Sequence, residues 1–212
     1  MKNIHDFIVI GAGISGCTLA SLLNKRFSDA SVLLVEHGRR LGGRATTRKS
    51  RKTQISEFDH GLPSISFSQN VSQDILTIIS PLIDSKKLLD ISKKILLMNK
   101  FGVLNNAYTN EKIYRCLPFM MNFCEEIINQ SYNPKKINFL FKTLIRSFER
   151  INNLWEIQLE NGSFIQAENL ILSSSLVAHS RCLKILKTNS LPLRDAFIPG
   201  KDKVIDSLLQ KT

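Results

Sequence analysis

The stretch HDFIVIGAGISG, residues 5–16, decides the fold. Its first six residues are mostly apolar and rich in β-branched side chains, which is typical of a buried parallel strand. A glycine-rich turn follows at once, residues 17–25 have helical character, and a second apolar run (SVLLV, residues 31–35) ends at Glu36. The order strand, glycine turn, helix, strand and acid predicts a Rossmann-like βαβ unit.

The glycines of this turn have distinct roles if the ligand is a dinucleotide. Gly11 permits the tight turn, Gly13 leaves room for a pyrophosphate, and Gly16 lets the helix pack closely on the sheet. The helix N-terminus presents free N–H groups and partial positive charge to phosphates. Glu36 is placed to accept hydrogen bonds from an adenosine ribose, and it disfavours a 2′-phosphate. The predicted cofactor site therefore contains Gly11, Ala12, Gly13, Ile14, Ser15, Gly16, Glu36 and His37. The alternative is a glycine turn that holds no nucleotide.

A second motif favours FAD over NAD. RLGGRATT, residues 40–47, matches R-x-G-G-R-x-x-[ST], which follows the Rossmann unit in one large class of flavoproteins. Gly42 and Gly43 allow the backbone to pass close to a bound cofactor. Arg44 can make charge-assisted hydrogen bonds to its pyrophosphate. The alternative is a basic, glycine-containing loop without a ligand.

Residues 57–64 read EFDHGLPS and supply an acid-x-Gly motif, Asp59-His60-Gly61. With the motifs above, residues 1–65 resemble the renalase branch of the flavin amine oxidase superfamily. The resemblance implies non-covalent FAD, with contacts at Ser15, Arg44, Pro63 and Ser64. Where the family continues with Ala-Gln-Tyr, this chain has Leu62-Pro63-Ser64. No catalytic side chain is therefore named, and His60 is interpreted as a structural residue rather than a base.

The rest of the chain predicts helices and then strands. The pattern of residues 71–98 is helical with a break at Pro81, and a further helix is expected to end near Asn129. Phe119, Met120 and Met121 either line a substrate cavity or pack in the core. Strands are expected within residues 137–148, 154–159 and 164–167, with an Asn161-Gly162 turn, and a buried strand at 169–174 returns to the nucleotide-binding sheet.

The predicted fold class is thus α/β, a Rossmann-like FAD-binding unit with an inserted α+β substrate domain of helices and an antiparallel meander. We expect the FAD-binding unit at residues 1–70, a partial substrate domain at 71–168, and the returning strand with a C-terminal tail at 169–212. Members of the resembling family continue well beyond this length, so we expect a truncated chain.

Composition narrows the class of protein. The chain has 212 residues, of which 43% are hydrophobic and 22% charged, which excludes collagen-like and fully disordered chains. No apolar run is long enough for a transmembrane helix. The net charge of +11 is concentrated between residues 39 and 52. This run suggests a nucleic-acid or membrane-surface contact, but we interpret it mainly as a solvated loop beside the pyrophosphate and expect no nucleic-acid partner.

The four cysteines, Cys17, Cys116, Cys124 and Cys182, form no C-x-x-C pair, and no metal site is predicted. The first strand begins too early for a signal peptide, so we expect a cytoplasmic protein.

The predicted function is that of an FAD-dependent oxidoreductase. It would transfer hydride from a small donor, an amine or a reduced nicotinamide, to flavin N5, with oxygen as acceptor. The alternative is a truncated, non-catalytic nucleotide-binding remnant, or one half of a split protein whose C-terminal half is a separate chain.

Overall fold

The computed structural model of the protein describes residues 4–49, 57–67, 70–106, 111–174 and 181–186. The helices are α1 (Ile14–Arg26), α2 (Gln73–Asp84), α3 (Asn122–Asn129) and α4 (Arg181–Leu186). The large sheet contains β1 (Ile4–Ile10), β2 (Val32–Val35), β10 (Ile137–Leu140), β11 (Ile145–Ile151), β12 (Leu154–Leu159) and β13 (Phe164–Leu172). The other strands are β3 (Ala45–Lys49), β4 (Glu57–Gly61), β5 (Ile65–Phe67), β6 (Leu88–Asp90), β7 (Leu96–Met98), β8 (Leu104–Asn106) and β9 (Lys112–Cys116).

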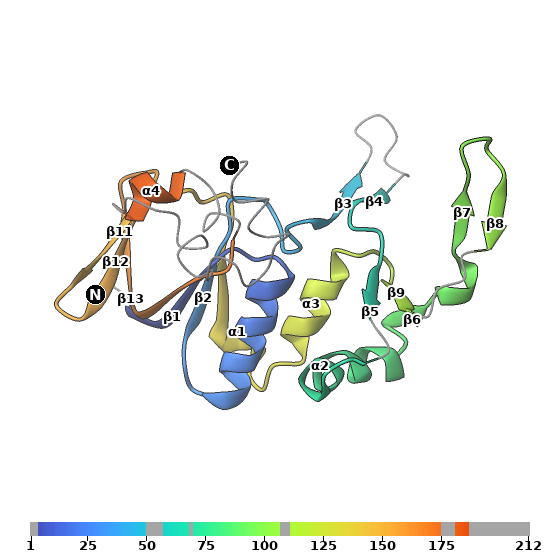
Figure 1. Ribbon diagram of the computed structural model, residues 1–212. Coiled ribbons are helices and arrows are strands. Elements are labelled where there is room, and N and C mark those ends of the chain that lie inside the picture. The colour runs from blue at the N-terminus through green and yellow to red at the C-terminus, as the bar shows by residue number, and fades with distance from the viewer. Residues whose placement is uncertain (1–3, 50–56, 68–69, 107–110, 175–180, 187–212) are drawn as a thin grey trace, which may run out of the picture.

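The large sheet has the strand order β10-β2-β1-β13-β12-β11 (Figure 1). Its first four strands are parallel, and β12 and β11 continue the sheet in antiparallel pairing. Parallel strands are joined by helical crossovers that cover the sheet, which explains the continuous apolar sequences of β1 and β2. The structure confirms the predicted α/β class and its Rossmann-like βαβ unit.

Both faces of the sheet are buried. On one face, Val9 and Leu34 pack in a core that includes α1 and α3. On the opposite face, Ile8 packs with Ile157 of the meander and Ile185 of α4. Neighbouring residues of β1 therefore point into different cores, as the alternation of side chains in a strand requires.

The outer part of the molecule consists of small antiparallel elements. Strands β3 and β4 form a two-stranded ribbon, β5, β9 and β6 form a three-stranded sheet, and β7 and β8 form a projecting hairpin (Figure 1). Ile79 and Leu82 of α2, with Leu88 and Cys116, belong to the same core as Val9. The outer part is therefore packed continuously with the large sheet.

The predicted helix over residues 71–98 is wrong in its second half. Pro81 lies inside α2, which continues to Asp84. The helix ends where the Lys86 and Lys87 N–H groups donate to the carbonyls of Ile83 and Leu82. Lys86 adopts a left-handed φ of 59°, so this ending is a Schellman motif with lysine at the position where glycine is usual. Residues 88–98 then form β6, a single 3₁₀ turn and β7.

The predicted strand within residues 137–148 is two strands. β10 pairs with β2 at one edge of the sheet, and β11 pairs with β12 at the other edge. The predicted strands at 164–167 and 169–174 are one continuous strand, β13, which contains the expected domain boundary at residues 168 and 169. The domain division itself stays a prediction. The Asn161-Gly162 turn is confirmed, with Gly162 at φ 82°.

Cys17, Cys116 and Cys124 are free and buried. Basic residues 51 and 52 of the run between residues 39 and 52, and the part of the predicted C-terminal tail after residue 186, lie outside the described residues.

Truncation of a core leucine tests the packing of β2. Leu34 is fully buried, and Leu34→Ala should lower the free energy of unfolding by about 2–5 kcal/mol because it leaves a cavity. The matched variant Leu22→Ala removes the same atoms from a side chain that is 43% exposed on α1. It should change the free energy of unfolding by about 0.5 kcal/mol. Urea denaturation measures both. Equal losses for the two variants would contradict the packing described.

Asp6 gives a pH-dependent prediction. Its Oδ2 accepts hydrogen bonds from the N–H and hydroxyl of Ser31, both at 2.7 Å. These bonds lower the pKa of the Asp6 carboxyl. The stabilisation is therefore present above the unfolded-state pKa of about 3.9 and is lost as pH falls through the lower, folded-state pKa. We expect Asp6→Asn to be less stable than wild type at neutral pH, with the difference shrinking below about pH 4 in acid titrations.

Candidate cofactor-binding site

The glycine-rich loop joins β1 to α1 at the C-terminal edge of the parallel strands. Gly11 has a φ of 102° and its N–H donates to the Val35 carbonyl at 2.8 Å. Helix α1 begins after Gly13, without a side-chain cap and without an acidic residue in its first turn. Free N–H groups and uncancelled helix-dipole charge are the features that bind phosphate.

Gly16 is required by the packing of α1 on β1. A Cβ atom at this position would overlap the Gly11 carbonyl oxygen. The Ser173 hydroxyl, just after β13, donates to the same carbonyl at 2.9 Å. The predicted role of Gly16 in close helix–strand packing is thus consistent with the structure, and β13 lies against the loop as well.

The glycine doublet packs directly on this loop. The Gly42 N–H donates to the Ala12 carbonyl at 2.9 Å, and Gly42 forms an isolated parallel bridge with Gly13. Gly42 and Gly43 have φ values of 120° and 57°. A Cβ at Gly43 would lie 3.1 Å from the Gly13 Cα. Two segments separated in sequence therefore form one glycine-lined cradle.

Glu36 lies at the end of β2 and joins this cradle. Its Oε2 accepts a hydrogen bond from the Ala12 N–H at 2.9 Å, and its Oε1 accepts one from the Gly38 N–H at 2.6 Å. A carboxylate has further acceptor capacity on both oxygens, so the predicted ribose contact stays compatible with this geometry. His37, the next residue, is exposed.

Of the remaining predicted residues, Arg44 lies just before the β3–β4 ribbon and Pro63 and Ser64 lie just after it. The Arg44 carbonyl accepts a hydrogen bond from the Leu62 N–H at 3.1 Å, which brings the loop through Pro63 and Ser64 back to the doublet. Arg44 and Pro63 are exposed, Ser64 is half-buried, and Ser15 is exposed at the start of α1. Within the described residues, no side chain pairs with the Arg44 guanidinium.

Asp59 has a structural role that the sequence did not predict. Its side chain is 5% exposed and lies 3.2 Å from Arg115 Nη2. Its Oδ1 accepts hydrogen bonds from the Met120 N–H at 2.9 Å and the Thr47 hydroxyl at 2.8 Å. The acid of the acid-x-Gly motif therefore fixes the entry to α3. The acid-x-Gly motif in the sequence marked Asp59 as a residue of interest. It did not show that Asp59 would contact Thr47, Arg115 and Met120.

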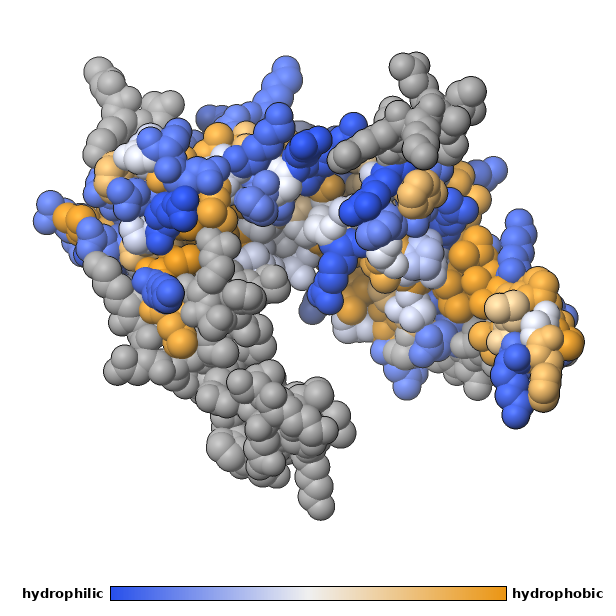
Figure 2. Space-filling model, turned by 90° about the horizontal axis from the view of Figure 1, so that it is seen from above, coloured by the Kyte–Doolittle hydropathy of each residue, from blue (hydrophilic) through white to orange (hydrophobic). Residues whose placement is uncertain are grey.

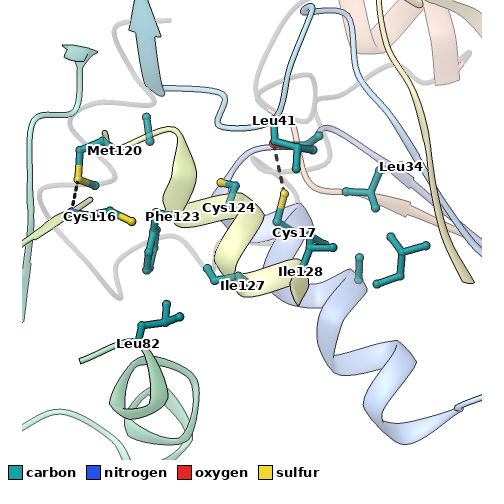
Figure 3. Packing of buried hydrophobic residues seen from close by; sticks show 14 of the residues in the cluster. Cys17, Leu34, Leu41, Leu82, Cys116, Met120, Phe123, Cys124, Ile127 and Ile128 are labelled. Atoms are coloured by element: carbon teal, nitrogen blue, oxygen red, sulfur yellow. Dashed lines mark hydrogen bonds between the residues drawn. The ribbon is translucent and has the colours of Figure 1, made fainter. Parts of the chain in front are cut away.

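Two methionines next to this entry have different environments. Met120 is fully buried, and its sulfur accepts the Cys116 N–H at 3.2 Å (Figure 3), so it is a core residue. Met121 lines a cavity of about 360 Å³, together with Leu41, Glu125 and two further sets of side chains. These sets are the arginines Arg39 and Arg40 and the stacked rings of Phe139 and Phe141.

The buried thiols next to the loop are unreactive. Cys17 donates from Sγ to the Ala12 carbonyl at 3.4 Å, and it faces Cys124 of α3 (Figure 3). A hydrogen bond with Cys124 and burial raise the pKa of the Cys17 thiol. Burial likewise raises the pKa of Cys116 to about 12. Neither group is a thiolate nucleophile at neutral pH.

The cradle, the open helix N-terminus and the acid at the end of β2 define a domain of the FAD/NAD(P)-binding Rossmann type. In agreement, residues 9–79 match the family described as NAD(P)-binding Rossmann-like domain. A stretch of 82 residues is 38% identical to UDP-galactopyranose mutase of Mycoplasma genitalium, covering 37% of this chain and 18% of the mutase.

Two solved structures share the fold. A candidate protoporphyrinogen oxidase from Exiguobacterium sp. 255-15 aligns with a TM-score of 0.60 at 11% identity, over 92% of this chain and 64% of that one. A putrescine oxidase triple mutant redesigned in its cofactor binding aligns with a TM-score of 0.56 at 13% identity, over 84% and 59%. The chain spans less than two thirds of each of these three proteins. The renalase branch stays a prediction.

Among the described residues, no helix is long and apolar enough to cross a membrane. The same residues contain no group of three His, Cys, Asp or Glu side chains placed to hold a metal ion.

The Asp59 contacts predict a graded loss of stability. Asp59→Ala leaves the buried Met120 N–H without an acceptor and should lower the free energy of unfolding by about 1–3 kcal/mol. Asp59→Asn retains an acceptor oxygen for Met120 and Thr47 and should lose clearly less. Chemical denaturation compares the two variants. Equal losses would show that the charge, rather than the acceptor, is what holds α3.

Proposed function

We propose that this chain binds FAD non-covalently, with the pyrophosphate over residues 11–16 and the ribose at Glu36. The observation that carries the proposal is the contact between the glycine loop and the doublet beside an uncapped helix N-terminus. A Rossmann unit needs only the loop to bind NAD, whereas the doublet adds a second glycine backbone next to the pyrophosphate position.

The residues fit the cofactor in three ways. Gly13 is open, since a Cβ there would meet only the Gly43 Cα at 3.9 Å, and the space above it suits a phosphate. Glu36 has acceptor capacity for ribose hydroxyls and would repel a 2′-phosphate. The exposed Arg44 is close enough in the chain to the doublet to neutralise a diphosphate.

We propose further that the protein is an oxidoreductase. FAD, when bound, accepts hydride at N5; we infer a small donor, an amine or a reduced nicotinamide, with oxygen as the final acceptor. The fold shared with a candidate protoporphyrinogen oxidase and a putrescine oxidase supports this class. This chain's own contribution is to bind and orient the cofactor. We infer a cytoplasmic location, because the cytoplasm keeps thiols such as those of Cys17, Cys116 and Cys124 reduced.

The alternative is that the chain holds the nucleotide without turning over a substrate. It is favoured by the sequence Leu62-Pro63-Ser64, which offers no amide or phenol beside the loop. Anaerobic bleaching of bound FAD by amines or reduced nicotinamides would support the oxidoreductase, and FAD that no such donor reduces would support the binding role.

A glycine series tests cofactor binding. Gly13→Ala should leave the free energy of unfolding nearly unchanged, because its Cβ meets no close neighbour, but should weaken FAD binding at least about tenfold by filling the cradle. Gly16→Ala should impair folding as well, because its Cβ overlaps the Gly11 carbonyl. Absorbance near 450 nm, a property of the flavin, and FAD fluorescence quenching measure binding.

The matched control is Gly162→Ala in the β12–β13 turn. Its Cβ meets nothing within 4 Å, and its φ of 82° costs some stability far from the cradle. We expect unchanged FAD affinity. A wild-type protein that takes up no FAD, or a Gly13→Ala variant that binds as tightly as wild type, would overturn the proposal.

A further inference from the structure

The β7–β8 hairpin and its turn, residues 96–106, form a projecting arm with a large apolar surface. Its large hydrophobic side chains are between 51% and 78% exposed: Leu96, Leu97, Met98, Phe101, Val103 and Leu104. Figure 1 shows the arm extending away from the sheet and helices, and Figure 2 shows apolar surface at that end of the molecule. Exposed hydrophobic patches of this kind mark an interaction surface.

Both faces of the arm carry large apolar side chains, while Asn105 and Asn106 of β8 lie opposite Leu97 and Leu96. Leu96, Leu97 and Met98 are consecutive residues of β7 and all are exposed, although neighbouring side chains of a strand point to opposite faces. Met98 pairs with Leu104 across the hairpin. A protein that packed on one face would leave the other in water. A medium that surrounds the arm would cover both, and an isolated hairpin gains most from such a medium because it is marginal in water.

Four backbone N–H groups at the turn are paired within it. The Asn99 side-chain oxygen accepts the N–H groups of Phe101 at 2.9 Å and Val103 at 3.0 Å. The Gly102 N–H donates to the Asn99 carbonyl, and the Asn99 N–H donates to the Val103 carbonyl. Backbone polar groups must be paired in this way before a segment can enter hydrocarbon at low cost. Phe101, the most exposed of the arm's large hydrophobic side chains, lies in this turn.

The charge around the arm is positive. Residues 86–104 contain five lysines and one aspartate, a net charge of +4. Lys93 and Lys94 are exposed at the base of the arm, and Lys100 lies over the Phe101 ring at the tip, 5.0 Å from its centroid. Lysines that flank apolar side chains suit a surface that carries phosphates above hydrocarbon, because the ammonium groups reach the phosphates.

We propose that the arm inserts its tip into the surface of an anionic lipid bilayer and anchors the protein there. Strands rise about 3.4 Å per residue, so the three-residue strands of the arm reach roughly 10 Å. This matches the ~5–10 Å to which interfacial segments enter the boundary between headgroups and acyl chains. Lys93 and Lys94 then lie at headgroup level. The arm lies on a different part of the molecule from the glycine cradle, so the two functions are separable by mutation.

Vesicle sedimentation with the full chain tests the proposal. We expect the wild-type protein to pellet with vesicles of phosphatidylcholine and phosphatidylserine, and less with phosphatidylcholine alone or at high salt. The double variant Phe101→Ser/Leu104→Ser should lower the partition coefficient at least about tenfold. Tyr132→Ser, which alters a side chain that is 77% exposed away from the arm, should leave partitioning unchanged.

A pair of lysine variants distinguishes binding to anionic lipid headgroups from non-specific hydrophobic association. Lys93→Gln/Lys94→Gln should reduce the preference for anionic vesicles, whereas the matched pair Lys135→Gln/Lys136→Gln, also exposed, should not. Circular dichroism and FAD binding of each variant check that it is folded.

Fluorescence places the tip in the bilayer. Trp155 is the one tryptophan of the chain and lies in β12, so Phe101→Trp adds a single reporter at the tip. Its emission should shift to the blue with anionic vesicles and be quenched by brominated lipids, and Tyr132→Trp should show neither change. The proposal is overturned if the wild type does not bind vesicles, if the arm variants bind as well as wild type, or if the arm instead mediates a lipid-independent dimer in sedimentation velocity.

Discussion

The direct contact between two glycine backbones is the constraint on which the rest of the structure depends. Gly42 forms a parallel bridge with Gly13, and a Cβ at Gly43 would lie only 3.1 Å from the Gly13 Cα, so the segment after β2 approaches the loop after β1 most closely at its glycine doublet. The positive φ values of Gly42 and Gly43 turn the chain toward the β3–β4 ribbon. The same residues that leave space for a ligand therefore also set the direction of the chain beyond the Rossmann unit.

The outer part is attached to this contact through hydrogen bonds and a common core. Leu62 donates to Arg44, and the buried Asp59 carboxylate holds the N–H of Met120 where the chain turns into α3. Helix α3 then packs on α1, with Cys124 against Cys17 (Figure 3). A displacement of the ribbon would thus reach the first turn of α1, because the Asp59 side chain, Met120, Cys124 and Cys17 are buried and packed against one another.

The parts predictable from sequence are those in which local sequence decides structure. The apolar runs of β1 and β2 and the glycines between them required a βαβ unit, since few other arrangements bury such strands. The end of α2 was missed because Lys86 occupies a left-handed position normally held by glycine. The separation of β10 from β11 was missed because pairing partners distant in sequence decide it: β10 requires β2, and β11 requires β12.

The position of β13 in the sheet has a consequence for synthesis of the protein. β1 can pair with β2 soon after both leave the ribosome, but its other edge pairs with Phe164–Leu172, which are made much later. Until then β1 presents an open edge to other chains, and the late, non-local pairing makes completion of the sheet slow. The Ser173 hydroxyl reaches the Gly11 carbonyl only at this final stage. The glycine-rich loop is therefore completed only after translation of nearly all the described chain, and until then a nascent polypeptide exposes an incomplete glycine cradle together with an unpaired strand.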